Sequence, residues 1–143
     1  MTTQQIETLF DHYLAAFSTY DLDAVVACYH IPCTLHTPDK IVQVNSTDDC
    51  RQELNDIFTQ LKQANTAKII ARKASYMSIN DELLLACVDW DFIDEQGQVF
   101  ADFCAFYHIS ISNSTKQEIV IVNVVSHELS NSLSLANVFS ISG

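Results

Sequence analysis

The sequence predicts an α+β domain in which helices come first and an antiparallel sheet follows. Apolar residues repeat with the period of a helix up to about residue 66, and with the period of a strand beyond it. Very short turns join the strand-like runs, and such turns make consecutive strands antiparallel neighbours. No low-complexity linker interrupts the 143 residues, a length typical of one domain. We therefore expect one domain over residues 1–128, followed by a tail, 129–143, that the pattern does not assign.

The helical part contains three predicted segments. The first, 6–17, has an apolar stripe at helical spacing. A second, short helix is expected to begin at Asp21, a suitable N-cap, and to end before Pro32, which cannot continue a helix. The third begins at Ser46, three residues before Asp49, as in a capping box. The stripes consist of Ile6, Leu9, Phe10, Tyr13, Leu14 and Phe17, then Leu22, Val25, Val26 and Tyr29, then Cys50, Leu54, Ile57, Phe58 and Leu61.

Four strand-like runs follow, at residues 68–79, 82–94, 98–112 and 117–127, with polar turns between them. In the second and fourth runs, the residues of both faces are apolar. An antiparallel sheet with one face in water alternates apolar and polar residues, so both faces of this sheet need a cover. The helices can cover one face. We predict that the other packs against a second copy in a two-fold homodimer.

The composition excludes several classes of partner. The chain has 7 Lys and Arg against 18 Asp and Glu, and its net charge of −11 repels nucleic acid and anionic membrane surfaces. No stretch reaches the roughly 20 apolar residues of a membrane-spanning helix, and the N-terminus lacks the pattern of a signal peptide. The five cysteines lie inside regular segments, and we expect reduced, buried thiols in a cytoplasmic protein.

Two features bear on cofactors and metals. With only two glycines, the chain cannot build a glycine-rich phosphate loop. Cys28, His30, Cys33 and His36 place four possible zinc ligands within nine residues. Their spacing departs from that of established zinc sites, and apolar residues are interleaved with them. We therefore expect no metal and no cofactor.

Segments 12–17, 20–29 and 34–38 resemble the opening of the ketosteroid isomerases in the nuclear-transport-factor-2-like (NTF2-like, or SnoaL-like) superfamily. Residues 89–97 are similar to the middle hairpin of the same proteins. The resemblance covers about residues 5–128. It implies three helices packed on a curved antiparallel sheet, a cone-shaped, cystatin-like α+β fold, with a pocket between the helices and the sheet. Related proteins use this pocket for isomerase, cyclase, dehydratase or hydrolase chemistry, or only to bind a ligand.

The resemblance also implies a role for one tyrosine. In the isomerases, a tyrosine of the first helix donates a hydrogen bond to the developing oxyanion, and Tyr13 stands at that position. The residue pattern alone favours Tyr13 as one more member of the apolar stripe, with its hydroxyl bound to a local partner. The proton-shuttling aspartate of the isomerases is replaced by Thr37, whose hydroxyl is no general base near neutral pH. Ketosteroid isomerisation is therefore disfavoured.

Other side chains could move a proton. His36 can act as a general base, but strand alternation is expected to point it away from Thr37. Asp102 could be a general acid between two phenylalanines, or could lie at the solvent-exposed end of its strand. Asp89 and Asp91 share one face of a strand, which suits either an acid–base pair or a solvated edge.

Three functional hypotheses remain open. The first is a pocket that binds a small hydrophobic molecule. The second is an acid–base enzyme of the isomerase, dehydratase or cyclase type. The third is a non-catalytic scaffold for dimerisation or protein contact, its pocket filled by aromatic side chains. The expected ligand contacts are Tyr13, Phe17, Tyr29, Asp89 and Phe106, and the candidate catalytic residues are Tyr13, His36 and Asp102.

Overall fold

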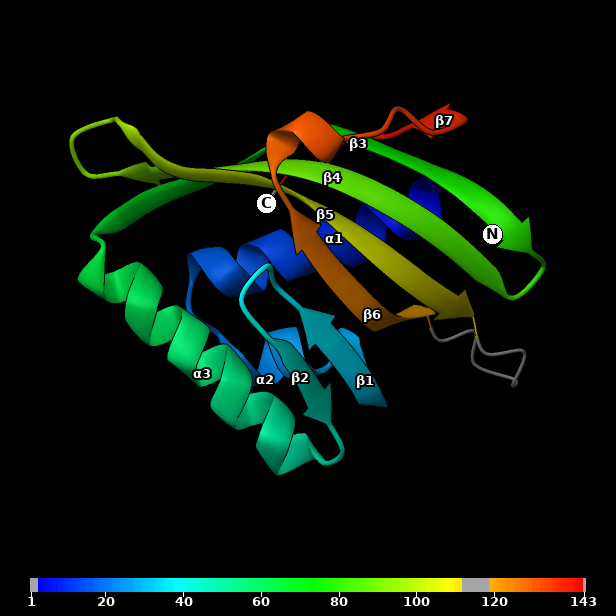
Figure 1. Ribbon diagram of the computed structural model, residues 1–143, viewed down its shortest axis with the longest axis horizontal. Coiled ribbons are helices and arrows are strands. Elements are labelled where there is room, and N and C mark those ends of the chain that lie inside the picture. The colour runs from blue at the N-terminus through cyan, green and yellow to red at the C-terminus, as the bar shows by residue number, and fades with distance from the viewer. Residues whose placement is uncertain (1–2, 112–118, 143) are drawn as a thin grey trace.

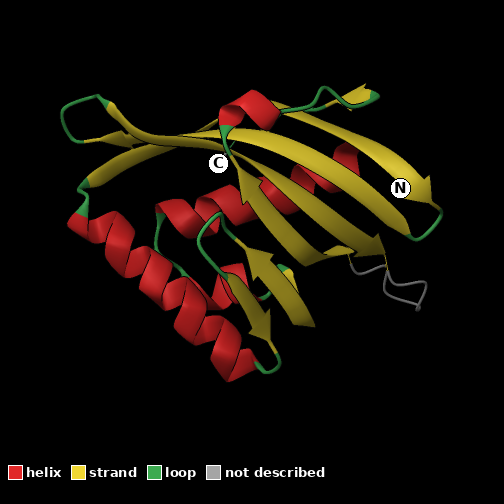
Figure 2. Cartoon of the chain, viewed as in Figure 1, coloured by secondary structure: helices red, strands yellow, loops and turns green. Residues whose placement is uncertain are grey.

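The structure is a computed structural model that describes residues 3–111 and 119–142. In these ranges, three α-helices lie on one side of a curved sheet of seven strands (Figure 1, Figure 2). The helices are α1 (Thr3–Ser18), α2 (Leu22–Val26) and α3 (Thr47–Gln63), and a short 3-10 helix, η1 (Leu129–Asn131), lies near the end of the chain. The strands are β1 (Tyr29–His36), β2 (Ile41–Val44), β3 (Thr66–Asn80), β4 (Leu83–Asp94), β5 (Val99–Ile111), β6 (Ile119–His127) and β7 (Asn137–Val138).

The strand order is β2-β1-β6-β5-β4-β3-β7. Strands β3 to β6 are consecutive antiparallel neighbours, as the short turns predict. Strand β1 runs antiparallel to β2 but parallel to β6. The sheet is therefore mixed rather than wholly antiparallel. The parallel pair is possible because α3 and three long strands lie between β1 and β6 in the chain, which leaves room for a crossover.

The α+β prediction is confirmed, and two helices begin at the predicted caps. Asp21 accepts a hydrogen bond from the backbone N–H of Ala24, and Ser46 accepts one from that of Asp49 at 3.1 Å. The four predicted strands correspond to β3, β4, β5 and β6, with ends that agree within two residues. The parts of these predictions that fall on residues 112–118 lie outside the described residues. No helix in the two described ranges is both long enough and apolar enough to cross a membrane.

The second helix ends earlier than its predicted apolar stripe, which includes Tyr29. Helix α2 ends at Val26, Tyr29 begins β1, and Pro32 lies within that strand. Backbone hydrogen bonds to distant strands decide the structure here, and the N–H of Ile121 donates to the carbonyl of Cys28 at 2.8 Å. Tyr29 is therefore held by the sheet rather than by a helix.

The tail that the sequence leaves unassigned forms a strap, residues 129–142, across the outer face of the sheet, opposite the helices (Figure 1). The hydroxyl of Ser132 donates to Asp89 Oδ1 on β4 at 2.6 Å. The backbone N–H of Leu135 donates to Ser75 Oγ on β3 at 2.9 Å. Strand β7 then pairs with the edge of β3. We call residues 129–142 the C-terminal strap.

The C-terminal strap ends against α1, on the other side of the sheet. Phe139 is buried, with its ring centroid 5.5 Å from that of Phe10 and 5.9 Å from that of Tyr76. The backbone N–H of Ser140 donates to Glu7 Oε2 at 3.0 Å. The strap thus connects the outer face of the sheet to the first helix around the β3 edge.

The strap covers part of the sheet face that the helices leave open. Ser75, Cys87 and Asp89 lie on this outer face and are nevertheless buried. Part of the second apolar face is therefore covered by the same chain, and the predicted second copy is not needed over that part.

Candidate functional site

A cavity of about 430 Å³ lies between α1, α3 and the inner face of the sheet. Apolar side chains form most of its walls. Leu14 and Phe17 come from α1, Ile57 from α3, and Phe92 and Phe103 from β4 and β5. Binding pockets for small molecules commonly measure about 300–1,000 Å³ and are lined in this way. The cavity therefore has the size and the lining of a small-molecule site.

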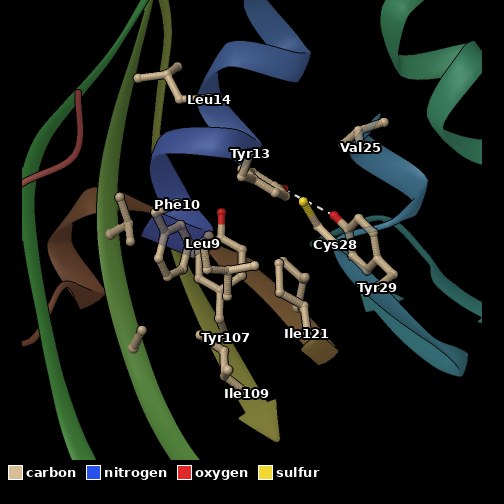
Figure 3. Close-up of a cluster of buried hydrophobic side chains, with 14 of the residues drawn as sticks. Leu9, Phe10, Tyr13, Leu14, Val25, Cys28, Tyr29, Tyr107, Ile109 and Ile121 are labelled. Atoms are coloured by element: carbon tan, nitrogen blue, oxygen red, sulfur yellow. Dashed lines mark hydrogen bonds between the residues drawn. The ribbon is translucent and has the colours of Figure 1, made fainter. Parts of the chain in front are cut away.

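Three phenols and one indole line the buried part of the cavity. The hydroxyls of Tyr13 and Tyr29 lie 3.0 Å apart, and Trp90 Nε1–H donates to the Tyr107 hydroxyl at 2.9 Å. The rings of Tyr13 and Tyr107 are nearly perpendicular, with centroids 5.9 Å apart, so the two hydrogen-bonded pairs adjoin. Figure 3 shows the Tyr13 and Tyr29 hydroxyls pointing toward each other, with Tyr107 nearby. We call Tyr13, Tyr29 and Tyr107 the phenol cluster.

Each member of the phenol cluster comes from a different element. Tyr13 belongs to the apolar stripe of α1, and Tyr29 is the first residue of β1. Tyr107 lies on β5 beside Trp90 of β4, and both side chains are on the inner face of the sheet. Three segments that are distant in the sequence thus meet at this point, and no local motif contains them.

Burial raises the pKa of Tyr13, Tyr29 and Tyr107 well above the ordinary value of 10.0. These hydroxyls are therefore neutral hydrogen-bond donors at physiological pH. A neutral donor held in a dry site can stabilise partial negative charge on a ligand oxygen without adding a charge of its own.

The mouth of the cavity has a different character, because ionisable side chains line it. His36 ends β1 and is half-buried, whereas Asp102, His127 and Glu128 are exposed. The cavity thus has neutral donors in its buried part, apolar walls, and charged or chargeable groups where it meets water. This arrangement suits a ligand with an apolar body and a polar group at each end.

Five of the seven residues predicted for the site line this cavity, namely Tyr13, Phe17, Tyr29, His36 and Asp102. Their placement in one cavity is observed, whereas their roles remain predictions. Thr37 also lines the cavity beside His36, so the expected opposition of the two side chains is wrong. The reason is that β1 ends at His36, and strand alternation does not extend to Thr37.

Asp89 and Phe106 lie on the opposite face of the sheet, which corrects their predicted placement. Successive residues of a strand point to opposite faces, and Trp90 and Tyr107 point into the cavity. Their neighbours Asp89 and Phe106 therefore point outward. Asp91 shares the outer face with Asp89, so the two carboxylates form no acid–base pair in the cavity.

Trp90 and Tyr107 are the two hydrogen-bonding residues of the buried part of the cavity that sequence reasoning missed. The available signal was the alternation of Phe103, Ala105 and Tyr107 along one face of β5, opposite Trp90 on β4. This signal is ambiguous in the sequence, because the residues between them are also apolar.

The four possible zinc ligands are dispersed. The thiol of Cys28 donates to the carbonyl of Ala24 at 3.5 Å, and His36 lies at the cavity mouth. The neighbouring Cys50 thiol raises the pKa of Cys33, and the Cys33 thiol lowers the pKa of Cys50. In the described part of the chain, no group of three or more His, Cys, Asp or Glu side chains could hold a metal ion.

Comparison with known proteins gives a match to one family model. A family model described as "NTF2-like protein (DUF6841)" matches residues 4–128. Comparison with curated proteins gives no match.

Solved structures of similar fold come from several bacteria. A domain of unknown function with a cystatin-like fold from Nostoc punctiforme is 12% identical over 87% of this chain and 75% of its own, with a TM-score of 0.72. An NTF2-like protein of unknown function from Shewanella oneidensis is 14% identical over 88% of this chain and 98% of its own, with a TM-score of 0.69. A ketosteroid isomerase-like protein from Erwinia carotovora atroseptica is 15% identical over 87% of this chain and 93% of its own, with a TM-score of 0.63. At such identities, the likeness concerns the fold alone.

Proposed function

This chain belongs to the NTF2-like protein family DUF6841, and we propose that it is a small-molecule-binding domain whose cavity takes an apolar ligand with an oxygen acceptor. The fold hosts many chemistries, so the proposal depends on the site. The observation that carries it is one cavity of about 430 Å³ that combines apolar walls with the phenol cluster.

Elementary energetics supports a ligand of this kind. A ligand that buries roughly 200 Å² of apolar surface gains about 5 kcal/mol, before the cost of association is subtracted. A carbonyl oxygen that faces a buried phenol adds a hydrogen bond and fixes the orientation of the ligand. The apolar walls would therefore supply most of the affinity, and the phenol cluster would supply the selectivity.

A panel of naphthyl and biaryl ketones tests the proposal by thermal denaturation. A ligand that binds only the folded protein raises its melting temperature. We expect a rise with at least one ketone in the wild-type chain, and no rise in Ile57→Trp, where the larger side chain fills the cavity. Thr59→Trp is the matched control, because Thr59 is exposed on the same helix and does not line the cavity. A rise that survives in Ile57→Trp, or none with any ketone, would contradict the proposal.

The second candidate is an acid–base enzyme that uses the same cavity. One observation favours it, since Tyr13, His36 and Asp102 all line the cavity. His36 or Asp102 would move a proton next to a carbonyl while the phenols stabilise the oxyanion. Exchange of the hydrogens next to the carbonyl for solvent deuterium, followed by NMR, tests this alternative. Exchange that is no faster with the protein than without it excludes proton transfer on these ketones.

A scaffold with a self-filled pocket has less support, because the cavity is open despite its aromatic lining. We also propose a cytoplasmic location. The five cysteines are free and buried, which suits a reducing compartment.

A further inference from the structure

We propose that the ligand is longer than the cavity and that its apolar tail leaves the mouth along Phe100. This inference rests on the proposed binding function and specifies the class of ligand, an elongated carbonyl compound with an apolar tail. It follows from a row of phenylalanine rings that continues from the cavity wall onto the exposed hairpin between β4 and β5.

The row consists of Phe103, Phe92 and Phe100. Phe103 and Phe92 line the cavity, and their rings are nearly perpendicular, with centroids 5.3 Å apart. The ring of Phe92 also packs against that of Phe100, at a centroid distance of 6.2 Å. Phe100 itself lies outside the cavity and is 41% exposed. The apolar wall of the cavity therefore continues past its mouth and into solvent.

A bulge in β5 explains how the Phe100 ring reaches Phe92. Phe92 pairs with Ala101 and Ile93 pairs with Val99, so Phe100 is an extra residue between the two pairs. Strict alternation along β5 would point Phe100 to the outer face of the sheet, away from Phe92. Bulges occur preferentially beside functional sites, where they redirect a side chain. Here the redirected side chain is a phenyl ring next to the cavity.

The hairpin that carries Phe100 is held in position by hydrogen bonds. Asp94 Oδ1 accepts from two backbone N–H groups of the turn, at 2.9 and 3.0 Å. The backbone N–H of Glu95 donates to the carbonyl of Asn65, just beyond α3, at 3.1 Å. The surface around Phe100 is thus formed before a ligand arrives, which lowers the entropic cost of binding to it.

The position of Phe100 identifies what covers it. Single exposed apolar residues are common on proteins, whereas apolar patches that adjoin a cavity mark ligand-binding surfaces. Phe100 belongs to the second kind, because its ring packs against the cavity wall and the adjacent Val99 is 49% exposed. A ligand that fills the cavity and extends from its mouth would cover this patch directly.

Distances along β5 set the length of such a ligand. Tyr107, of the phenol cluster, and Phe103 are four residues apart on this strand, roughly 13 Å. Tyr107 and Phe100 are seven residues apart, roughly 23 Å. A compact ring system whose oxygen is bound at the phenol cluster would end near Phe103. Only an elongated molecule bound in the same way would contact Phe100.

Two ketones that differ only in their tail test the inference, 4-acetylbiphenyl and 4-acetyl-4′-hexylbiphenyl. Trp90 is the only tryptophan of the chain and lines the cavity, so quenching of its fluorescence measures binding there. We expect the wild-type chain to bind the hexyl ketone at least about tenfold more tightly, since its tail buries further apolar surface.

Phe100→Ala should weaken binding of the hexyl ketone about fivefold and leave binding of 4-acetylbiphenyl unchanged, because only the longer molecule reaches Phe100. Ile79→Ala is the matched control, since Ile79 is 47% exposed on β3 and lies outside the cavity. It should change neither affinity. Equal affinities of the two ketones for the wild-type chain, or an unchanged affinity of Phe100→Ala for the hexyl ketone, would overturn the inference and leave the proposed function standing. Binding of neither ketone would reject both.

A measurement on the wild-type chain alone makes the test independent of how the variants fold. The terminal methyl group of the bound hexyl ketone should give nuclear Overhauser effects to the Phe100 ring, and the acetyl methyl group should give them to Tyr107. The reverse assignment would overturn the inference. Light scattering covers the other occupant, a second copy of the chain. A molecular mass that falls from dimer to monomer in Phe100→Ala would assign this surface to a subunit contact and also overturn the inference.

Discussion

Burial of three tyrosine hydroxyls is expected to make this chain less stable as the pH rises through the alkaline range. Their pKa values are raised in the folded state, whereas an unfolded chain has the ordinary value near 10.0. Above that pH the folded state binds more protons than the unfolded state, so the free energy of unfolding falls as pH rises. The contribution is fully present below about pH 10. Beyond that it is lost at up to about 1.4 kcal/mol per pH unit for each phenol, until the folded pKa is passed.

Urea unfolding at a series of alkaline pH values checks this prediction. Tyr107→Phe should make the decline shallower by up to about 1.4 kcal/mol per pH unit, because one of the three phenols is removed. Burial also raises the pKa of Cys28 from 9.0 to about 11, so a smaller decline should begin near pH 9 in both proteins. Equal slopes above pH 10 in the wild-type chain and the variant would show that Tyr107 ionises as readily folded as unfolded.

Single residues also show how far the site could be predicted. Tyr13 and Phe17 lie on a helix whose apolar residues are confined to one face. The pattern itself therefore places their side chains in the interior. Trp90 and Asp89 are adjacent on a strand that is apolar on both faces, and alternation separates them without saying which face is inside. That choice depends on where the helices pack, which is a property of the whole chain.

At the level of elements, Phe139 is the residue by which the C-terminal strap is anchored to the core. It is 4% exposed and packs against Phe10 and Tyr76, whereas the preceding Val138 is 81% exposed. We expect Phe139→Ala to lower the free energy of unfolding by about 3 kcal/mol, through lost transfer free energy and the cavity left behind. Val138→Ala, its neighbour in β7, should change it by less than about 0.5 kcal/mol.

Urea denaturation of the two variants measures both values. Equal stability of Phe139→Ala and Val138→Ala would show that the strap adds nothing to the folded state. A lower slope with denaturant concentration in Phe139→Ala alone would indicate that the strap opens before the domain does.

The elements that the sequence could predict are those whose signals lie close together in the chain. The apolar stripe of each of helices α1, α2 and α3 lies within one short segment, and α2 and α3 begin at an N-cap in the same segment. Strands β3 to β6 follow one another through short connections. Strands β1, β2 and β7 are short, and two of them pair with strands distant in the sequence. Such pairings depend on the closed tertiary fold, so neither β1, β7 nor the strap could be read from local periodicity.

For the whole molecule, the strap narrows the surface on which a second copy could pack. The predicted two-fold homodimer is left with the outer face over β5, β6 and β1, where Phe106 and Val125 are half-buried. A hydrogen-bonded row of His108, Asn123 and Thr34 crosses the same strands, with Nδ2 of Asn123 donating to Thr34 at 2.7 Å. This face therefore offers apolar contact and polar groups that could pair across a two-fold axis.

Light scattering at increasing protein concentration tests the homodimer. We expect a mass approaching twice 16.1 kDa in the wild-type chain, and a mass near 16.1 kDa in Phe106→Asp. Met77→Asp is the matched control, because Met77 is exposed at the other edge of the outer face. Each chain carries a net charge of −11, so two copies repel each other, and added salt should strengthen association by screening that repulsion. A wild-type mass near 16.1 kDa at every concentration and salt level would mean that the strap and the chain's own packing suffice to cover the second face.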